Sequence, residues 1–355
     1  MKKRLAFVLV VVCLMGCLFG CGGETAQPNE TTQPATALQE QKDYTPYLCP
    51  WDMDVVAQAK ADGKLHYYFM AAEDLFKGKW GDSCLLVFPD GTTLLFDSGV
   101  KGYGPVLLQN LQKMGVTKLD YIVISHPHSD HQNGVFHPDN IESGVLGNIP
   151  VGKVYFSKIV TTSRDDHSYV EDACIAKNIP YEILEQGSGV QLTDAVSMEV
   201  LWPIEGTKDQ VFATAQYNLE INQNSMVARI DFGEHRALFA GDLHSVGELL
   251  CIGRNGAEKL KADLLKVPHH GHDTSSSREF LAVVKPELAV ATGRAEVVDL
   301  LLNNYKQQEI ELLYDLIHGY IHVSADSTGK MTYETSRHNT PDEQKAILAQ
   351  SGTNS

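Results

Sequence analysis

The stretch Ser125-His126-Pro127-His128-Ser129-Asp130-His131 follows an apolar, strand-like run and carries four side chains that can bind a metal. Imidazole and carboxylate ligands suit zinc and other first-row divalent cations. Residues i and i+2 of an extended segment point to the same side, so His126 and His128 can share one cation. Asp130 and His131 begin the next segment, which is expected to be helical, and can face a second cation. An idle surface cluster is disfavoured because other parts of the chain complete the site.

Acids and histidines also follow three further apolar runs, at the points where strands are expected to end. Asp97 follows residues 93–96, Asp242 follows 237–241, and His269 and His270 follow 264–268. A single acid in such a place is usually a turn residue or a helix cap. Together with the histidine-rich stretch, however, these residues predict a site for two cations.

This combination resembles the metallo-β-lactamase superfamily, whose hallmark is His-x-His-x-Asp-His. A narrower resemblance, over roughly residues 65 to 336, is to the branch that contains the nuclease-like domains of competence proteins and the phosphorylcholine esterases. It rests on Gly81-Asp82-Ser83, on Gly241-Asp242 and on the run His-His-Gly-His-Asp-Thr-Ser at 269–275. The resemblance implies an α/β fold in which two mixed sheets pack face to face between outer helices, an αββα sandwich. It says little about the substrate.

The resemblance also implies a division of the ligands between two divalent cations, with zinc expected and manganese or iron as alternatives. The first cation is assigned to His126 and His128, the second to Asp130, His131 and His270, and Asp242 is expected to bridge them.

Two further residues are expected to act beside the metals. Asp97 is predicted to accept a hydrogen bond from a ligand histidine and so to fix the tautomer of that ring. His269 is expected to face the substrate, where it stabilises charge or protonates the leaving group, although a structural role stays open. The expected catalytic residues are therefore Asp130, Asp242 and His269.

The chain departs from the family pattern at one place. Most members carry a third histidine for the first cation shortly before the Gly-Asp strand, but residues 222–227 contain none. The first cation is then left with its two histidines, Asp242 and solvent, with an asparagine side chain as an open alternative. His167 and His235 are spare candidates, but His235 falls in an expected hairpin turn and is predicted to be exposed.

Residues 1–20 are predicted to be a signal peptide, because a basic start precedes an apolar run too short to span a membrane. The run ends in Leu18-Phe19-Gly20-Cys21, which resembles a bacterial lipobox and predicts lipid attachment to Cys21. Cys17 is a second possible site, and a plain secretory peptide is the alternative. The protein is then expected outside the cytoplasm, anchored to the bacterial cell membrane.

The rest of the chain divides by composition. Residues 21–45 are polar and lack apolar periodicity, which predicts a flexible tether. Residues 46–336 are numerous enough for one large hydrolase domain, and residues 337–355 are predicted to be a frayed polar tail. Cys84 and Cys251 lie in apolar surroundings and are predicted to be buried thiols.

The formal net charge is −16. Proteins that bind nucleic acid usually carry a basic surface, so this charge disfavours nucleic acid as a partner. A cationic choline group would suit acidic and aromatic surroundings, for which Trp51, Trp80 and Trp202 are available.

The expected function is metal-dependent hydrolysis. Two cations can generate a nucleophile from water and stabilise in-line displacement at phosphorus, which favours a phosphodiesterase that acts on a phosphorylcholine ester or a related small molecule or polymer. An exonuclease or nucleotide phosphodiesterase of the competence-protein type is the alternative. A lactamase or thioesterase ranks lower because the third histidine is missing. A non-catalytic binding lipoprotein would not need the metal motif.

Overall fold

A computed structural model describes most of the chain from Tyr44 onward. The described residues are 44–70, 81–100, 102–135, 144–161, 168–212, 217–293 and 299–351. They belong to the second of two units, Tyr44–Ser355. None of the helices among them is long and apolar enough to cross a membrane. The predicted signal peptide, Cys21, Trp80 and His167 lie outside the described residues.

The first of two large sheets has the strand order β17-β16-β1-β2-β3-β4-β5-β7. Its strands are β1 (Leu65–Phe69), β2 (Cys84–Val87), β3 (Thr93–Phe96), β4 (Leu119–Ile124), β5 (Val151–Phe156), β7 (Tyr181–Ile183), β16 (Ile321–Ala325) and β17 (Met331–Thr335). Strands β3, β4, β5 and β7 run parallel to one another, and the other pairs are antiparallel.

The second sheet has the order β15-β14-β13-β12-β11-β9-β8. Its strands are β8 (Gly189–Gln191), β9 (Val196–Trp202), β11 (Val227–Phe232), β12 (His235–Phe239), β13 (Leu264–Lys266), β14 (Leu288–Ala291) and β15 (Glu311–Tyr314). Strands β12 to β15 run parallel, and the rest pair antiparallel. A small parallel pair joins β6 (Val160–Thr161) to β10 (Val211–Phe212).

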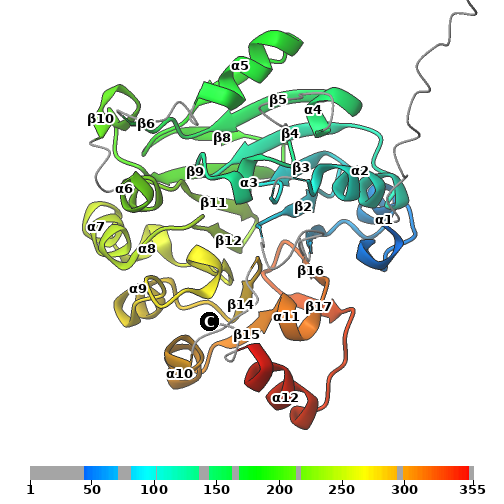
Figure 1. The fold of residues 1–355 in the computed structure, drawn as a ribbon, viewed down its shortest axis with the longest axis vertical. Helices are drawn as coiled ribbons and strands as arrows, with labels where there is room; N and C mark the ends of the chain where they lie inside the picture. The colour runs from blue at the N-terminus through cyan, green and yellow to red at the C-terminus, as the bar shows by residue number, and fades with distance from the viewer. Residues whose placement is uncertain are drawn as a thin grey trace, which may run out of the picture. The chain divides into compact units, whose positions relative to one another are not determined.

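The core has three apolar layers, one between the two sheets and one outside each sheet. Helices lie outside the two sheets (Figure 1), which confirms the predicted αββα sandwich. Successive strand residues point to opposite faces, so Tyr67 lies in the layer between the sheets while Tyr68 packs in the layer outside the first sheet. Helices α1 (Val55–Asp62), α2 (Gly104–Lys113), α4 (Val145–Asn148) and α5 (Ser168–Lys177) contribute to that outer layer. Helices α7 (Ser245–Asn255), α8 (Ala257–Leu260), α9 (Arg278–Val284), α10 (Asp299–Gln307) and α11 (Asp315–His318) contribute to the layer outside the second sheet.

The topology brings the predicted site residues to strand ends. Strands β3 and β4 are parallel neighbours in one sheet, and β12 and β13 are parallel neighbours in the other. The carboxyl ends of parallel neighbours meet at the same edge of a sheet. The residues that follow these four strands therefore converge between the two sheets.

Two predictions about the periphery were wrong. His235 is not exposed but fully buried, because Tyr67 of the facing sheet places its hydroxyl 3.0 Å from His235 Nε2. The C-terminal segment is not frayed as far as Ser351, because helix α12 (Pro341–Ser351) packs Ile347 against the outer core. Thr340 and Glu343 begin this helix with reciprocal side-chain-to-backbone hydrogen bonds, the capping box. Cys84 and Cys251 are buried thiols, as predicted.

Candidate metal centre

The histidine-rich stretch begins directly after β4 and runs into the short helix α3 (Ser129–Gln132), which contains Asp130 and His131. His126 Nε2 lies 3.1 Å from His128 Nδ1 and 3.7 Å from Asp242 Oδ2. These three residues form a group whose potential ligand atoms all lie within 4.8 Å of one another. The structure thus brings together the ligands predicted for the first cation.

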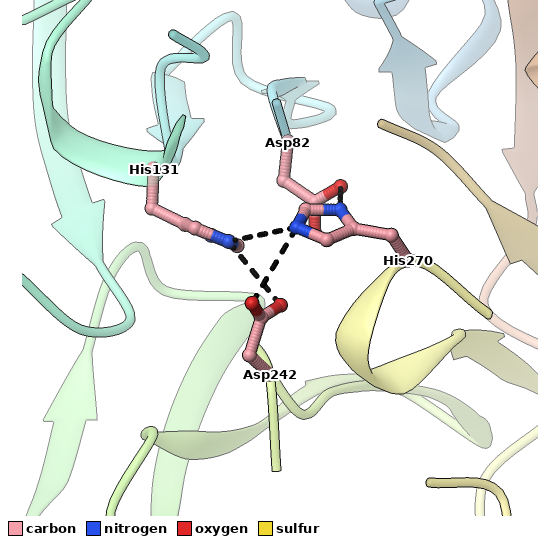
Figure 2. A group of neighbouring side chains, drawn as sticks. All are labelled: Asp82, His131, Asp242 and His270. Atoms are coloured by element: carbon pink, nitrogen blue, oxygen red, sulfur yellow. Dashed lines mark hydrogen bonds and ion pairs between the residues drawn. The ribbon is translucent and has the colours of Figure 1, made fainter. Parts of the chain in front are cut away.

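A second group, which also contains Asp242, consists of Asp82, His131, Asp242 and His270 (Figure 2). His131 Nε2 is 3.2 Å from Asp242 Oδ1, and His270 Nε2 is 3.4 Å from Asp242 Oδ2. The two Nε2 atoms are 3.3 Å apart, and Asp130 Oδ2 is 3.4 Å from that of His270. Asp242 therefore belongs to both groups, which is the geometry that a bridging carboxylate needs.

The protons on the two imidazoles show that this second group fits a cation. His131 Nδ1 lies 2.9 Å from Asp97 Oδ2, and His270 Nδ1 lies 3.0 Å from Asp82 Oδ1 and 3.0 Å from a backbone carbonyl. All three partners are acceptors, so both rings carry their proton on Nδ1. The two Nε2 lone pairs then face each other beside the Asp242 carboxylate. Two lone pairs and a carboxylate at this distance repel one another unless a positive charge lies among them.

The electrostatics of the same residues agree with this fit. Burial lowers the pKa of His131, but Asp242 and Asp97 raise it more, to well above its ordinary value. His270 has a strongly raised pKa in the same way, through Asp242 and Asp82. Burial raises the pKa of Asp242, but His270 and His131 lower it more, to well below its usual range. The centre attracts positive charge, as a metal site should.

Asp82 is the residue whose role the sequence analysis missed. It precedes β2, and one of its carboxylate oxygens accepts from His270 Nδ1 and from the Thr292 hydroxyl. Its other oxygen lies 2.6 Å from Nζ of Lys266, a residue that is 4% exposed. Both oxygens are thus engaged on the side of His270 that faces away from Asp242. Although Asp82 lies close enough to be counted among the ligands, it orients His270, and Asp130 is the better fourth donor.

The backbone is strained where the site residues are placed. Asp97, His269 and His270 have φ values of 54°, 46° and 53°, in the left-handed region that costs a non-glycine residue about 1 kcal/mol or more. His269 and His270 belong to the short 3-10 turn η5 (Pro268–Gly271), which follows β13. Because the turn bends the chain twice, the two adjacent rings diverge, with centroids 6.1 Å apart. His270 meets Asp242, and His269 turns toward α6 (Tyr217–Gln223).

The remaining expected residues have different surroundings. His269 Nε2 is 3.9 Å from Asp242 Oδ2, and its side chain is 16% exposed, so it lies at the open side of the centre. Trp51 packs edge-on against Tyr68 in the outer core, and Trp202 donates from Nε1 to the carbonyl oxygen of Gln223. These two tryptophans therefore build the core rather than the site.

Comparison with known proteins agrees with the geometry. Residues 78–137, which include Asp82, Asp97 and the whole histidine-rich stretch, match the family described as Metallo-beta-lactamase superfamily. The chain contains a metallo-β-lactamase superfamily domain.

The relatives of this metallo-β-lactamase domain include a protein named as a competence protein and a protein named after the ComE operon. The chain is 30% identical over 201 residues to Competence protein ComA of Neisseria gonorrhoeae, a match that covers 56% of this chain and 24% of the relative. It is 25% identical over 188 residues to ComE operon protein 3 of Bacillus subtilis, covering 53% and 22%. The matches thus span less than a quarter of each relative. Among solved structures, the metallo-beta-lactamase fold protein YhfI from Bacillus subtilis is 14% identical at a TM-score of 0.45, covering 76% of this chain and 99% of that structure.

Proposed function

We propose that this protein is a dinuclear, metal-dependent phosphodiesterase. The observation that carries the proposal is that Asp242 belongs to two donor groups at once. One cation would be held by His126, His128 and Asp242, and the other by Asp130, His131, His270 and Asp242. Divalent cations bound there would provide a nucleophile from water near neutral pH and would neutralise charge on phosphoryl oxygens.

The residues around these donors keep them in place. Asp97 and Asp82 hold the Nδ1 protons of His131 and His270, so that both Nε2 lone pairs stay directed at the centre. The strained turn at His269 keeps a second imidazole beside Asp242, on the side that solvent and substrate can reach.

The net charge supports one substrate class, and the relatives support another. A net charge of −16 favours a phosphodiester with a neutral or cationic headgroup, such as a phosphorylcholine ester, over a polyanion. The similarity to competence proteins supports an exonuclease or nucleotide phosphodiesterase as the second candidate.

We also propose that the enzyme works outside the cytoplasm as a lipoprotein. The support is the apolar run that ends in Leu18-Phe19-Gly20-Cys21. Cys21→Ala should release the protein from the membrane fraction, while Cys17→Ala should not. Release by Cys17→Ala alone would move the anchor, and retention of both variants would argue against a lipobox.

A substrate panel with metal analysis tests the activity. The panel contains bis(p-nitrophenyl) phosphate, p-nitrophenyl phosphorylcholine, single-stranded DNA and a β-lactam. We expect hydrolysis of the first two, about two divalent ions per chain, and loss of activity in chelator. Preferential degradation of DNA would favour the second candidate. Hydrolysis that persists without bound metal would refute the proposal.

A further inference from the structure

A cluster of neutral polar side chains lies beside Asp242, outside both donor groups. Asn222 of α6 is 5% exposed, and its Nδ2 lies 3.1 Å from His244 Nε2 and 3.4 Å from His269 Nε2. The rings of His244 and His269 are 4.7 Å apart. His269 Nδ1 is 2.5 Å from the Thr274 hydroxyl. One asparagine thus joins two imidazoles at the edge of the metal centre.

This network determines where the two rings carry their protons. An amide nitrogen only donates, so the Nε2 atoms of both histidines accept from Asn222. A neutral ring has one N–H, which must then be on Nδ1 in each case. His269 gives its Nδ1 proton to Thr274. His244 Nδ1–H has no acceptor among the described residues, and its ring is half-buried.

The backbone holds these groups next to the centre. His244 follows Asp242 by two residues and immediately precedes α7, and the backbone N–H of Ser245 donates to Thr274 O at 2.8 Å. The N–H of His269 donates to Gly241 O at 2.9 Å. Because both Nε2 atoms accept hydrogen bonds from Asn222, neither ring carries a second proton in this arrangement.

We propose that His244 binds the substrate through Nδ1–H, which donates to a phosphoryl oxygen, and that Asn222 is the positioning residue that keeps this proton on Nδ1. This inference rests on the proposed function and deepens it. An uncharged donor suits a diester oxygen, which shares a single negative charge. His269 in the same network has no proton on Nε2, so the donor role expected for His269 passes to His244.

Paired substitutions at His244 test the binding role. The amide nitrogen of asparagine lies near the position of Nδ1, whereas that of glutamine lies near Nε2. His244→Asn should therefore keep KM for bis(p-nitrophenyl) phosphate within about twofold of the wild type. His244→Gln and His244→Ala should raise KM about three- to tenfold, the effect of one neutral hydrogen bond, with kcat little changed and the metal content retained. The exposed His338→Gln is the matched control and should change nothing.

Equal KM values for His244→Gln and the wild type, in an enzyme that hydrolyses the diester, would overturn the inference while the proposed function stands. A rise in KM with loss of metal would also overturn it, because His244 would then act on the centre rather than on the substrate.

The tautomer can be observed without catalysis. Long-range ¹H–¹⁵N spectra of the zinc-loaded protein should show His244 protonated on Nδ1, and Asn222→Leu should abolish this preference. Inorganic phosphate should shift the His244 Nδ1–H signal in the wild type and not in His244→Gln. This result would support the inference even if no phosphodiester is hydrolysed. A proton on Nε2 of His244, or a phosphate-independent signal, would refute it.

Discussion

Two series of side chains in the domain have the same order, in which a carboxylate, two imidazoles and a second carboxylate contact one another in turn. The two series have different surroundings. At the centre the order is Asp97, His131, His270 and Asp82, with 3.3 Å between the facing nitrogens. Across β1, β16 and β17 the order is Asp62, His66, His322 and Glu334, with 3.0 Å between them. In both series each imidazole contacts a carboxylate through the nitrogen that does not face the other ring. His131 and His270 are called the central pair, and His66 and His322 the remote pair.

The difference is the third carboxylate. Asp242 lies 3.2 and 3.4 Å from the facing nitrogens of the central pair. At the remote pair the ring of Tyr68 stacks on His322 instead, with centroids 4.3 Å apart. Neither His66 nor His322 belongs to a candidate metal-binding group among the described residues. Two acid-backed imidazoles are therefore not sufficient for a metal site. The remote pair can be joined by a proton, whereas the central donors need a divalent charge.

The largest effect should follow removal of the carboxylate that distinguishes the two pairs. Asp242→Ala should lose both cations and lower turnover by on the order of 1000-fold, because Asp242 serves both donor groups. Elemental analysis and hydrolysis of bis(p-nitrophenyl) phosphate measure this. His322→Ala, the control at the remote pair, should keep about two cations per chain. Metal bound equally by both variants would break the comparison.

The second prediction concerns the Lys266 ammonium that pairs with Asp82. Asp62 and Glu334, the acids of the remote pair, have no such lysine partner among the described residues. Lys266→Met should cost about 3–5 kcal/mol of unfolding free energy, because it leaves the buried Asp82 charge unpaired. Urea denaturation of the metal-free protein measures this. The double variant Lys266→Met, Asp82→Asn should recover part of the loss. Lys153→Met, which breaks an exposed pair with Glu182, should cost less than about 1 kcal/mol. Equal costs at the two lysines would contradict the argument.

The third prediction compares the acids behind one ring of each pair. Asp97→Asn should weaken metal binding about 10- to 100-fold, because His131 loses the charge that orients it and increases its basicity. Competition with a zinc chelator measures the affinity. Asp62→Asn removes the same charge behind His66 and should leave metal affinity unchanged.

The central pair could be predicted in large part from the sequence, because its ligands follow strands in recognisable motifs. The positions of Asp97, Asp242 and His270 depend on parallel strands that end at one edge, and strand ends are readable from local patterns. Asp82 was visible only as part of a motif. The charge of Asp82, which orients His270, is balanced by Lys266, 184 positions later. The local sequence around Lys266 indicates only the end of an apolar strand.

Contacts between the sheets account for what could not be predicted. His235 follows a turn signal, but Tyr67 from the other sheet encloses it. His244 reads as a residue before a helix, and only the packing of α6 brings Asn222 to it. The remote pair joins residues 256 positions apart, and no local pattern marks either histidine.

The smallest effect should appear at the remote pair, as a pH dependence. Burial lowers the pKa of His322, and Glu334 on β17 offsets this only in part. Of the other groups that face this ring, His66 on β1 lowers its pKa further, and Asp62 at the end of α1 raises it. A histidine whose folded pKa lies below the unfolded value of about 6.5 binds fewer protons when folded. Its stabilising effect is therefore present above that pH and is lost as the pH falls. Urea denaturation between pH 7.5 and 5.5 should show a steeper loss of stability for the wild type than for His322→Phe. An equally steep loss in both would contradict this prediction. A shallower loss in the wild type than in His322→Phe would mean that the remote pair already carries a shared extra proton at neutral pH, and would make it the closer counterpart of the charged central pair.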